Sequence, residues 1–107
     1  MRSLLAALIS ASVILSATAA SALDRRVVIH NGAKEPIFYL HGSNTGTTDW
    51  EEDILGNDVL MPGAEVRVNF DDGTGFCVFD FKATFESGRE ETEYGVNVCE
   101  VSRFTFR

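Results

Sequence analysis

The stretch from Glu65 to Phe85 constrains the fold more than any other part of the chain. Polar and apolar residues alternate from Glu65 to Phe70, which is the period of a strand with one buried face. A turn-forming cluster and a second alternating run follow. The apolar side of this second run holds Cys77, Phe79, Phe81, Ala83 and Phe85. We therefore predict a β-hairpin, with strands over 65–70 and 77–85, whose phenylalanine-rich face lies in the protein interior.

The first residues have the pattern of a secretory signal peptide. Arg2 precedes an apolar run of about a dozen residues, which is too short to span a hydrocarbon core of roughly 30 Å. Ala20-Ser21-Ala22 is a small-residue cleavage site, and cleavage after Ala19 is the alternative. We expect a signal peptide over 1–22, a single domain over 23–107, and a periplasmic or secreted protein that does not insert into a membrane after cleavage.

The chain has two cysteines, Cys77 and Cys99. In an exported chain such a pair indicates a disulfide, which closes a loop of about 23 residues and stabilises the fold by roughly 3 kcal/mol. The wide spacing and the lack of a nearby His disfavour a redox or metal pair. A tight turn over 86–89 places Val98 opposite Cys77, so the bond requires either a bulge, for which Gly95 is the candidate, or a diagonal closure.

Shorter patterns predict the remaining elements. We expect strands over 26–31 and 37–40, the latter buried on both faces or nearly so, then a polar loop over 41–47 and two further strands near the C-terminus. The last two contain Tyr94, Val96 and Val98, and Phe104 and Phe106. The predicted fold is all-β: a small antiparallel β-sandwich of six to seven strands with one short helix and one disulfide.

The short helix is predicted over 49–55. Thr48 and Glu51 have the spacing of a capping box, as do Asp49 and Glu52, and Gly56 is a C-terminal stop signal. Trp50 and Ile54 lie four residues apart, so they are expected to pack against the sheet from one helix face. If Trp50 is instead exposed, it is a candidate binding residue, because tryptophan anchors carry much of the energy of protein interfaces.

No arrangement of residues indicates catalysis. His41, Ser43 and Asp49 are close in sequence, but no Gly-x-Ser-x-Gly elbow accompanies them. His30 falls within a strand and lacks the convergent donors that a metal site needs. We expect a protein that is not an enzyme and has no catalytic residues.

The acidic turn that begins with Asp71 and Asp72 is the best candidate for a metal site. Ca²⁺ takes six to eight oxygen ligands, and Asp80 is expected to join the pair, with Asp53 or Asp58 as alternatives. The turn lacks the ligand spacing of an EF-hand. Ordinary turn chemistry explains the same residues without metal, and no other cofactor is expected.

Charge narrows the range of partners. Nine basic residues and sixteen acidic ones give a net charge of −7. This balance makes nucleic acids and anionic membrane surfaces poor partners, because their phosphates repel an acidic protein. It suits cations or a basic protein.

Five sequence blocks carry a resemblance to a family of small exported bacterial proteins. The blocks lie between Trp50 and Cys99, roughly half of the chain, and are Trp50–Gly56, Leu60–Gly63, Phe70–Gly73, Cys77–Asp80 and Gly95–Cys99. Glu51 departs from the glycine that the family pattern has after the tryptophan. The resemblance implies a compact β-fold with paired cysteines and no established activity. Such chains sometimes carry the label argininosuccinate lyase, but the Gly-Ser-Ser-x-Met-Pro-x-Lys-x-Asn loop of that large helical enzyme has no counterpart here.

These observations favour a non-catalytic interaction or structural module that binds an unidentified protein or envelope component through loops at one end of the sandwich. A Ca²⁺-stabilised structural domain is one alternative. An inhibitor of a cationic exported hydrolase is another, since the chain is small and acidic and contains a cysteine pair.

Overall fold

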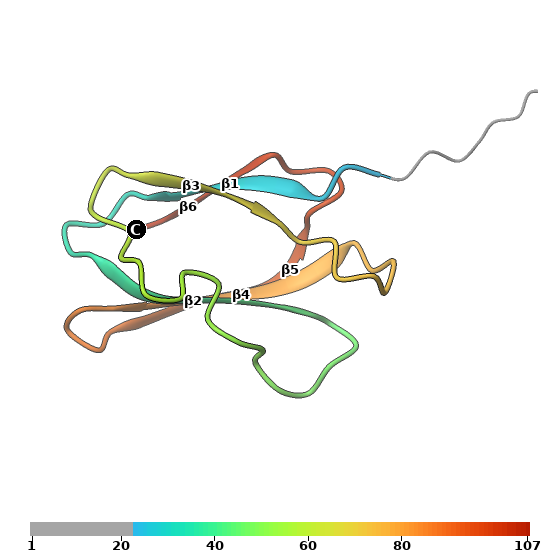
Figure 1. The fold of residues 1–107 in the computed structure, drawn as a ribbon, viewed down its shortest axis with the longest axis horizontal. Coiled ribbons are helices and arrows are strands. Elements are labelled where there is room, and N and C mark those ends of the chain that lie inside the picture. Colours follow the sequence, from blue (N-terminus) through green and yellow to red (C-terminus); the bar gives the residue numbers. More distant parts are fainter. Residues whose placement is uncertain (1–22) are drawn as a thin grey trace, which may run out of the picture.

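The computed structural model describes residues 23–107, so the predicted signal peptide lies outside the described residues. Within this range the chain forms six strands and no helix. The strands are β1 (Arg26–Asn31), β2 (Ile37–Asn44), β3 (Glu65–Asn69), β4 (Val78–Phe85), β5 (Glu90–Asn97) and β6 (Arg103–Phe106). They form two three-stranded sheets, β3-β1-β6 and β2-β4-β5, which Figure 1 shows as facing layers. The prediction of an all-β, sandwich-like fold is confirmed.

The core lies between the two sheets and centres on β4. Its inward-facing residues, Phe79, Phe81, Ala83 and Phe85, are almost fully buried. The Phe81 ring stacks on Phe70 at a centroid distance of 4.8 Å and meets Phe104 edge-on at 5.3 Å. Each buried phenylalanine contributes roughly 1.5–3 kcal/mol through loss of apolar surface to water. The predicted phenylalanine-rich interior is therefore confirmed.

The pairing predicted for this region is wrong. β3 and β4 do not form a hairpin, because β3 pairs with β1 and β4 lies between β2 and β5. Both hydrogen-bonding edges of β4 are occupied, so β3 has no edge of β4 to pair with. The residues that link β3 to β4 cross from one sheet to the other. A polar turn between two alternating runs is common to a hairpin and to such a crossover, so the pattern does not distinguish them.

The last strand also differs from the antiparallel prediction. β6 pairs with β1 in the parallel orientation, with Ile29 opposite Phe104 and Asn31 opposite Phe106. The chain leaves β5, crosses to the other sheet through residues 98–102, and runs alongside β1 in the same direction. The alternation of polar and apolar residues indicates which face of a strand is buried, but it does not indicate whether the strand pairs in the parallel or the antiparallel orientation.

The predicted helix over 49–55 is not present in residues 23–107, and β2 is longer than predicted. β2 extends through His41 to Asn44, which the sequence pattern placed in a polar loop. The residues expected to be helical run beside the free edge of β2, where the Ile54 amide donates to the Leu40 carbonyl at 2.7 Å. Seven residues make a marginal helix in isolation, so hydrogen bonds to the strand edge prevail over the local capping signals. Tyr39, expected to be buried, is 51% exposed.

The disulfide Cys77–Cys99 is confirmed, with the two Cα atoms 5.3 Å apart. Cys77 directly precedes β4, and Cys99 lies in the turn after β5. Register between β4 and β5 shifts between Phe79 and Phe81, next to Gly95, whose φ of 72° is favourable only for glycine. A bulge is therefore present at the candidate position, but it does not bring Cys99 opposite Cys77, and the bond closes diagonally. Beyond it the Val98 amide donates to the Cys77 carbonyl, so Cys99 lies one residue past the position opposite Cys77.

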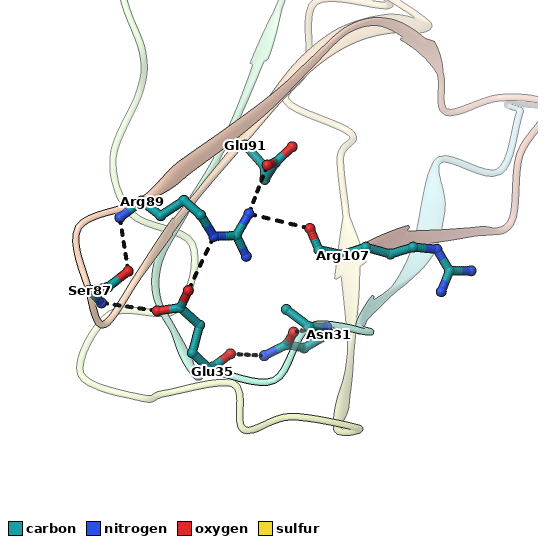
Figure 2. A network of polar contacts seen from close by, with 7 residues as sticks. Asn31, Glu35, Ser87, Arg89, Glu91 and Arg107 are labelled. Atoms are coloured by element: carbon teal, nitrogen blue, oxygen red, sulfur yellow. Dashed lines mark hydrogen bonds and ion pairs between the residues drawn. The ribbon is translucent and has the colours of Figure 1, made fainter.

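A polar network fastens the two sheets together at one end of the molecule (Figure 2). Glu35, in the connection between β1 and β2, accepts hydrogen bonds from the Ser87 amide and from Arg89 Nε, each at 3.1 Å. Arg89 also pairs with Glu91 and donates to the Arg107 carbonyl. The β4–β5 turn is thereby tied both to the β1–β2 connection and to the C-terminus.

This network predicts a loss of stability in acid. Hydrogen bonds from Ser87, with that from Arg89, hold the pKa of Glu35 below its ordinary value of 4.5. The ionised carboxylate therefore stabilises the fold above that value, and the contribution is lost as the pH falls through the lower folded-state pKa. In urea unfolding at a series of pH values below about 5, Glu35→Gln should lose less stability than the wild type. A Glu86→Gln variant, altered in the same turn outside the network, should follow the wild type; equal slopes for all three proteins would contradict the prediction.

A second prediction concerns Asn31, which is fully buried. Its side-chain amide donates to the carbonyls of Glu35 and Leu60, and its Oδ1 accepts from the Ala33 amide. Asn31→Ala removes three buried hydrogen bonds, and only the Leu60 carbonyl keeps another donor, the Ile37 amide. The substitution should lower the free energy of unfolding by about 2–3 kcal/mol, measured by urea denaturation. The matched control is Asn57→Ala at an exposed position. Similar small effects for both variants would show that Asn31 does not hold this end together.

Candidate functional site

The acidic residues predicted as Ca²⁺ ligands serve as hydrogen-bond acceptors for the loop that contains them. Asp71 Oδ1 accepts from the Gly73 amide, and Asp72 Oδ1 accepts from the amide and hydroxyl of Thr74. The second oxygen of Asp72 accepts from Asn44 Nδ2 at 2.8 Å. Partial burial acts to raise the pKa of Asp72, but the hydrogen bonds from Thr74 and Asn44 together outweigh it and hold that pKa below its ordinary value.

Asp80 is not brought to this loop. It lies on the outer face of β4, where its Oδ1 accepts from the Gly95 amide at 2.9 Å and holds the bulge of β5. Within residues 23–107, no group of three or more His, Cys, Asp or Glu side chains is close enough to hold a metal ion. The Ca²⁺ hypothesis stays a prediction, and the arrangement of these side chains lends it no geometric support.

The other polar residues singled out in the sequence position the segment 45–53 on the outer face of sheet β2-β4-β5. His41 Nδ1 lies 2.6 Å from the Glu51 carbonyl, and Ser43 Oγ accepts from the Glu51 amide. His30 lies on the other sheet, 3.2 Å from the Thr105 hydroxyl. His41 and Ser43 thus hold the overlying segment in place, and Asp49 is exposed.

Trp50 lies on this outer face and is outside the hydrophobic core cluster, contrary to its predicted role in the core. It is half-buried, and Lys82 Nζ lies 5.0 Å from the centroid of its ring. A cation at this distance from an indole face is attracted by the negative potential of the ring. Ile54, its predicted helical neighbour, packs against the core instead. The two side chains separate because the backbone here is not helical.

A cleft of about 220 Å³ lies beside Trp50. Its lining residues are Ser43, Thr47, Thr48, Asp49, Trp50, Asp80 and Tyr94. Tyr94 is 71% exposed, more than any other large apolar or aromatic residue of 23–107. None of the four ion pairs within residues 23–107 involves Asp49 or Asp80. The cleft therefore combines two aromatic side chains with two carboxylates that have no cationic partner in this part of the chain.

Sequence reasoning singled out Trp50 and Asp80 separately but did not find this cleft. It treated Tyr94 as one of the alternating residues of a strand and Asp80 as a metal ligand. The three come from β4, β5 and the segment after β2, and the β4–β5 pairing brings Tyr94 beside Asp80. The relevant signal was the outer face of β4, which carries Asp80 and Lys82 at positions between the inward-facing phenylalanines.

Comparisons with models of protein families, with curated proteins and with solved structures found no match. The family resemblance therefore stays a prediction. Within residues 23–107, no helix is long and apolar enough to cross a membrane.

The cleft depends on the segment after β2, which predicts a role for Asp53. Asp53 Oδ1 accepts from the amides of Leu40 and Leu55 and so fastens this segment to the free edge of β2. Asp53→Ala should accelerate hydrogen exchange at the Leu40 amide and lower the free energy of unfolding by about 1–2 kcal/mol. Glu52→Ala, at an exposed neighbouring position, is the control. If the Leu40 amide exchanges equally slowly in both variants, Asp53 does not anchor the segment.

Proposed function

We propose that the protein is a non-catalytic interaction module, exported to the periplasm or the exterior, that binds a protein partner through the cleft beside Trp50. The single observation that carries this proposal is the presence of Trp50 and Tyr94 outside the core, around a cleft with two carboxylates. Aromatic side chains supply large contact areas with few rotatable bonds, which is why they are enriched at interfaces. The proposal places the binding surface on a sheet face, in contrast to the loop ends expected from the sequence.

Charge supports a partner with basic side chains. The chain carries a net charge of −7, and Asp49 and Asp80 line the cleft without a cationic partner in the described part of the chain. Lys82 already occupies the face of the Trp50 ring, so the exposed ring of Tyr94 is the one left to accept an ammonium or guanidinium group of a partner. An inhibitor of a cationic exported hydrolase is a special case of this function, and the same acidic cleft favours it.

The fold and the disulfide are compatible with the proposed setting. Disulfides persist in oxidising compartments, and a chain of this size with a small core benefits from one. In a small exported β-sandwich the inner faces form the core, which leaves the outer faces available for binding.

Variants of the cleft test the proposal. The oxidised protein, immobilised and exposed to envelope extract, should capture a basic protein that elutes with salt, because exposed charge pairs are screened. Tyr94→Ala and Trp50→Ala should each reduce capture by about tenfold, corresponding to a loss of about 1.4 kcal/mol per anchor. The same comparison with lysozyme as the added partner addresses the inhibitor hypothesis.

The matched control is Val101→Ala, which removes an exposed apolar side chain elsewhere on the surface. It should capture the partner as the wild type does. Equal capture by wild type, both cleft variants and the control would contradict the proposal, as would a captured partner that is acidic and insensitive to salt. Circular dichroism of each variant ensures that a loss of capture is not a loss of folding.

A further inference from the structure

Three arginines converge on the outer face of the other sheet, β3-β1-β6. Arg67 of β3 and Arg103 of β6 are both paired with Val28 of β1, one on each side. The residues that flank Val28 in β1 are fully buried, so Val28 and its two partners face outward. Neighbouring strands lie about 4.8 Å apart, so the Cβ atoms of the two arginines are about 10 Å apart across Val28. Arg26 lies two residues before Val28 and therefore on the same face.

These side chains surround a hollow of about 450 Å³. Its lining residues are Asp24, Arg26, Val28, Arg67, Ser102 and Arg103. Because arginine side chains are longer than half the separation of their Cβ atoms, the guanidinium groups can contact a common ligand above Val28.

The charges in the hollow are unevenly compensated. Asp24 pairs with Arg26 through both oxygens, with Nε–Oδ1 at 3.0 Å and Nη2–Oδ2 at 3.3 Å. Arg103 pairs with Glu65, which lies outside the lining. Arg67 forms no ion pair or side-chain hydrogen bond with any residue of 23–107. The pKa of Asp24 is lowered mainly by its hydrogen bonds with Arg26, and the charge of Arg67 adds a smaller lowering effect. Three of the chain's nine basic residues thus share one hollow with a single lining carboxylate.

We propose that this arginine hollow binds a phosphate group. Arg67 makes the main contact with the phosphate, and the Asp24 carboxylate competes with the phosphate for Arg26. The planar guanidinium fork matches phosphate oxygens in bidentate geometry, and the Asp24–Arg26 pair shows the same geometry with a carboxylate. Phosphate offers more oxygens and more charge than one carboxylate, which suits three arginines. The acidic remainder of the chain repels extended anionic surfaces, so the source is a soluble phosphate compound and not a membrane.

The test is a nuclear magnetic resonance titration of the oxidised protein with inorganic phosphate, at constant ionic strength maintained with chloride. Saturable shifts should be confined to residues around Val28. Arg67→Gln should weaken binding about tenfold or more, since it removes a charged bidentate hydrogen-bond donor. Asp24→Asn should strengthen binding severalfold, because it removes the carboxylate that competes for Arg26. Arg107→Gln, outside the hollow, is the control and should bind as the wild type does.

Two results would overturn the proposal. One is a set of chemical-shift changes that is the same for phosphate and for chloride, or that neither Arg67→Gln nor Asp24→Asn alters. Either finding would indicate general screening of charge by ions. The other comes from a second arm of the experiment, with vesicles that contain an anionic phospholipid: binding to vesicles without saturable binding of inorganic phosphate would show a diffuse charged face in place of a phosphate site. The outcome is independent of the cleft beside Trp50, which lies on the opposite sheet.

Discussion

The contact between the inner face of β4 and the opposing sheet is the constraint on which the rest of the structure depends. Phe81 has no solvent exposure. It packs against rings from the two edge strands of the other sheet: Phe70, directly after β3, and Phe104 in β6. Gly42 in β2 makes this contact sterically feasible, because a Cβ at that position would lie 2.4 Å from Phe70 Cε1. The entry of Phe70 into the core also explains why the chain crosses between sheets after β3 and does not turn back as a hairpin.

Both inner faces are committed to the core, and the two outer faces differ in chemistry. The outer face of β2-β4-β5 combines Trp50 and Tyr94 with the carboxylates of Asp49 and Asp80, which form no ion pair within residues 23–107. The outer face of β3-β1-β6 gathers Arg26, Arg67 and Arg103 around Val28. The chain has a net charge of −7 and nevertheless carries one locally basic hollow. A sheet permits such a division since alternate residues of each strand point to opposite sides.

Local patterns in the sequence predicted the buried face of β4, but neither the pairing of the strands nor the exposure of Tyr39. The alternation around Phe79 and Phe81 predicted the interior face of β4 correctly, and the two cysteines predicted the disulfide. The sequence left open whether a bulge at Gly95 or a diagonal closure accommodates the bond. The partner of β3 and the orientation of β6 were mispredicted, because alternation is compatible with hairpin, crossover and parallel arrangements alike. The helix over 49–55 was predicted from capping residues, whereas Asp53 uses its carboxylate to bind the edge of β2.

The candidate sites were the least predictable part. Trp50 contacts Lys82 and lines a cleft with Tyr94, residues that are separated from it by more than thirty positions in the sequence. Arg67 and Arg103 are likewise distant in sequence and meet only because both strands flank β1. Neither grouping is visible without strand order, and strand order depends on tertiary packing rather than on local propensity.

The most direct test of the central contact is a set of nuclear Overhauser measurements on the aromatic rings of the oxidised protein. The account predicts cross-peaks from the Phe81 ring to the rings of both Phe70 and Phe104, because their centroids lie about 5 Å from that of Phe81. A Phe81 ring that shows contacts only to residues of its own sheet, together with rapid exchange of the β4 amides, would contradict a dry interior between the two sheets.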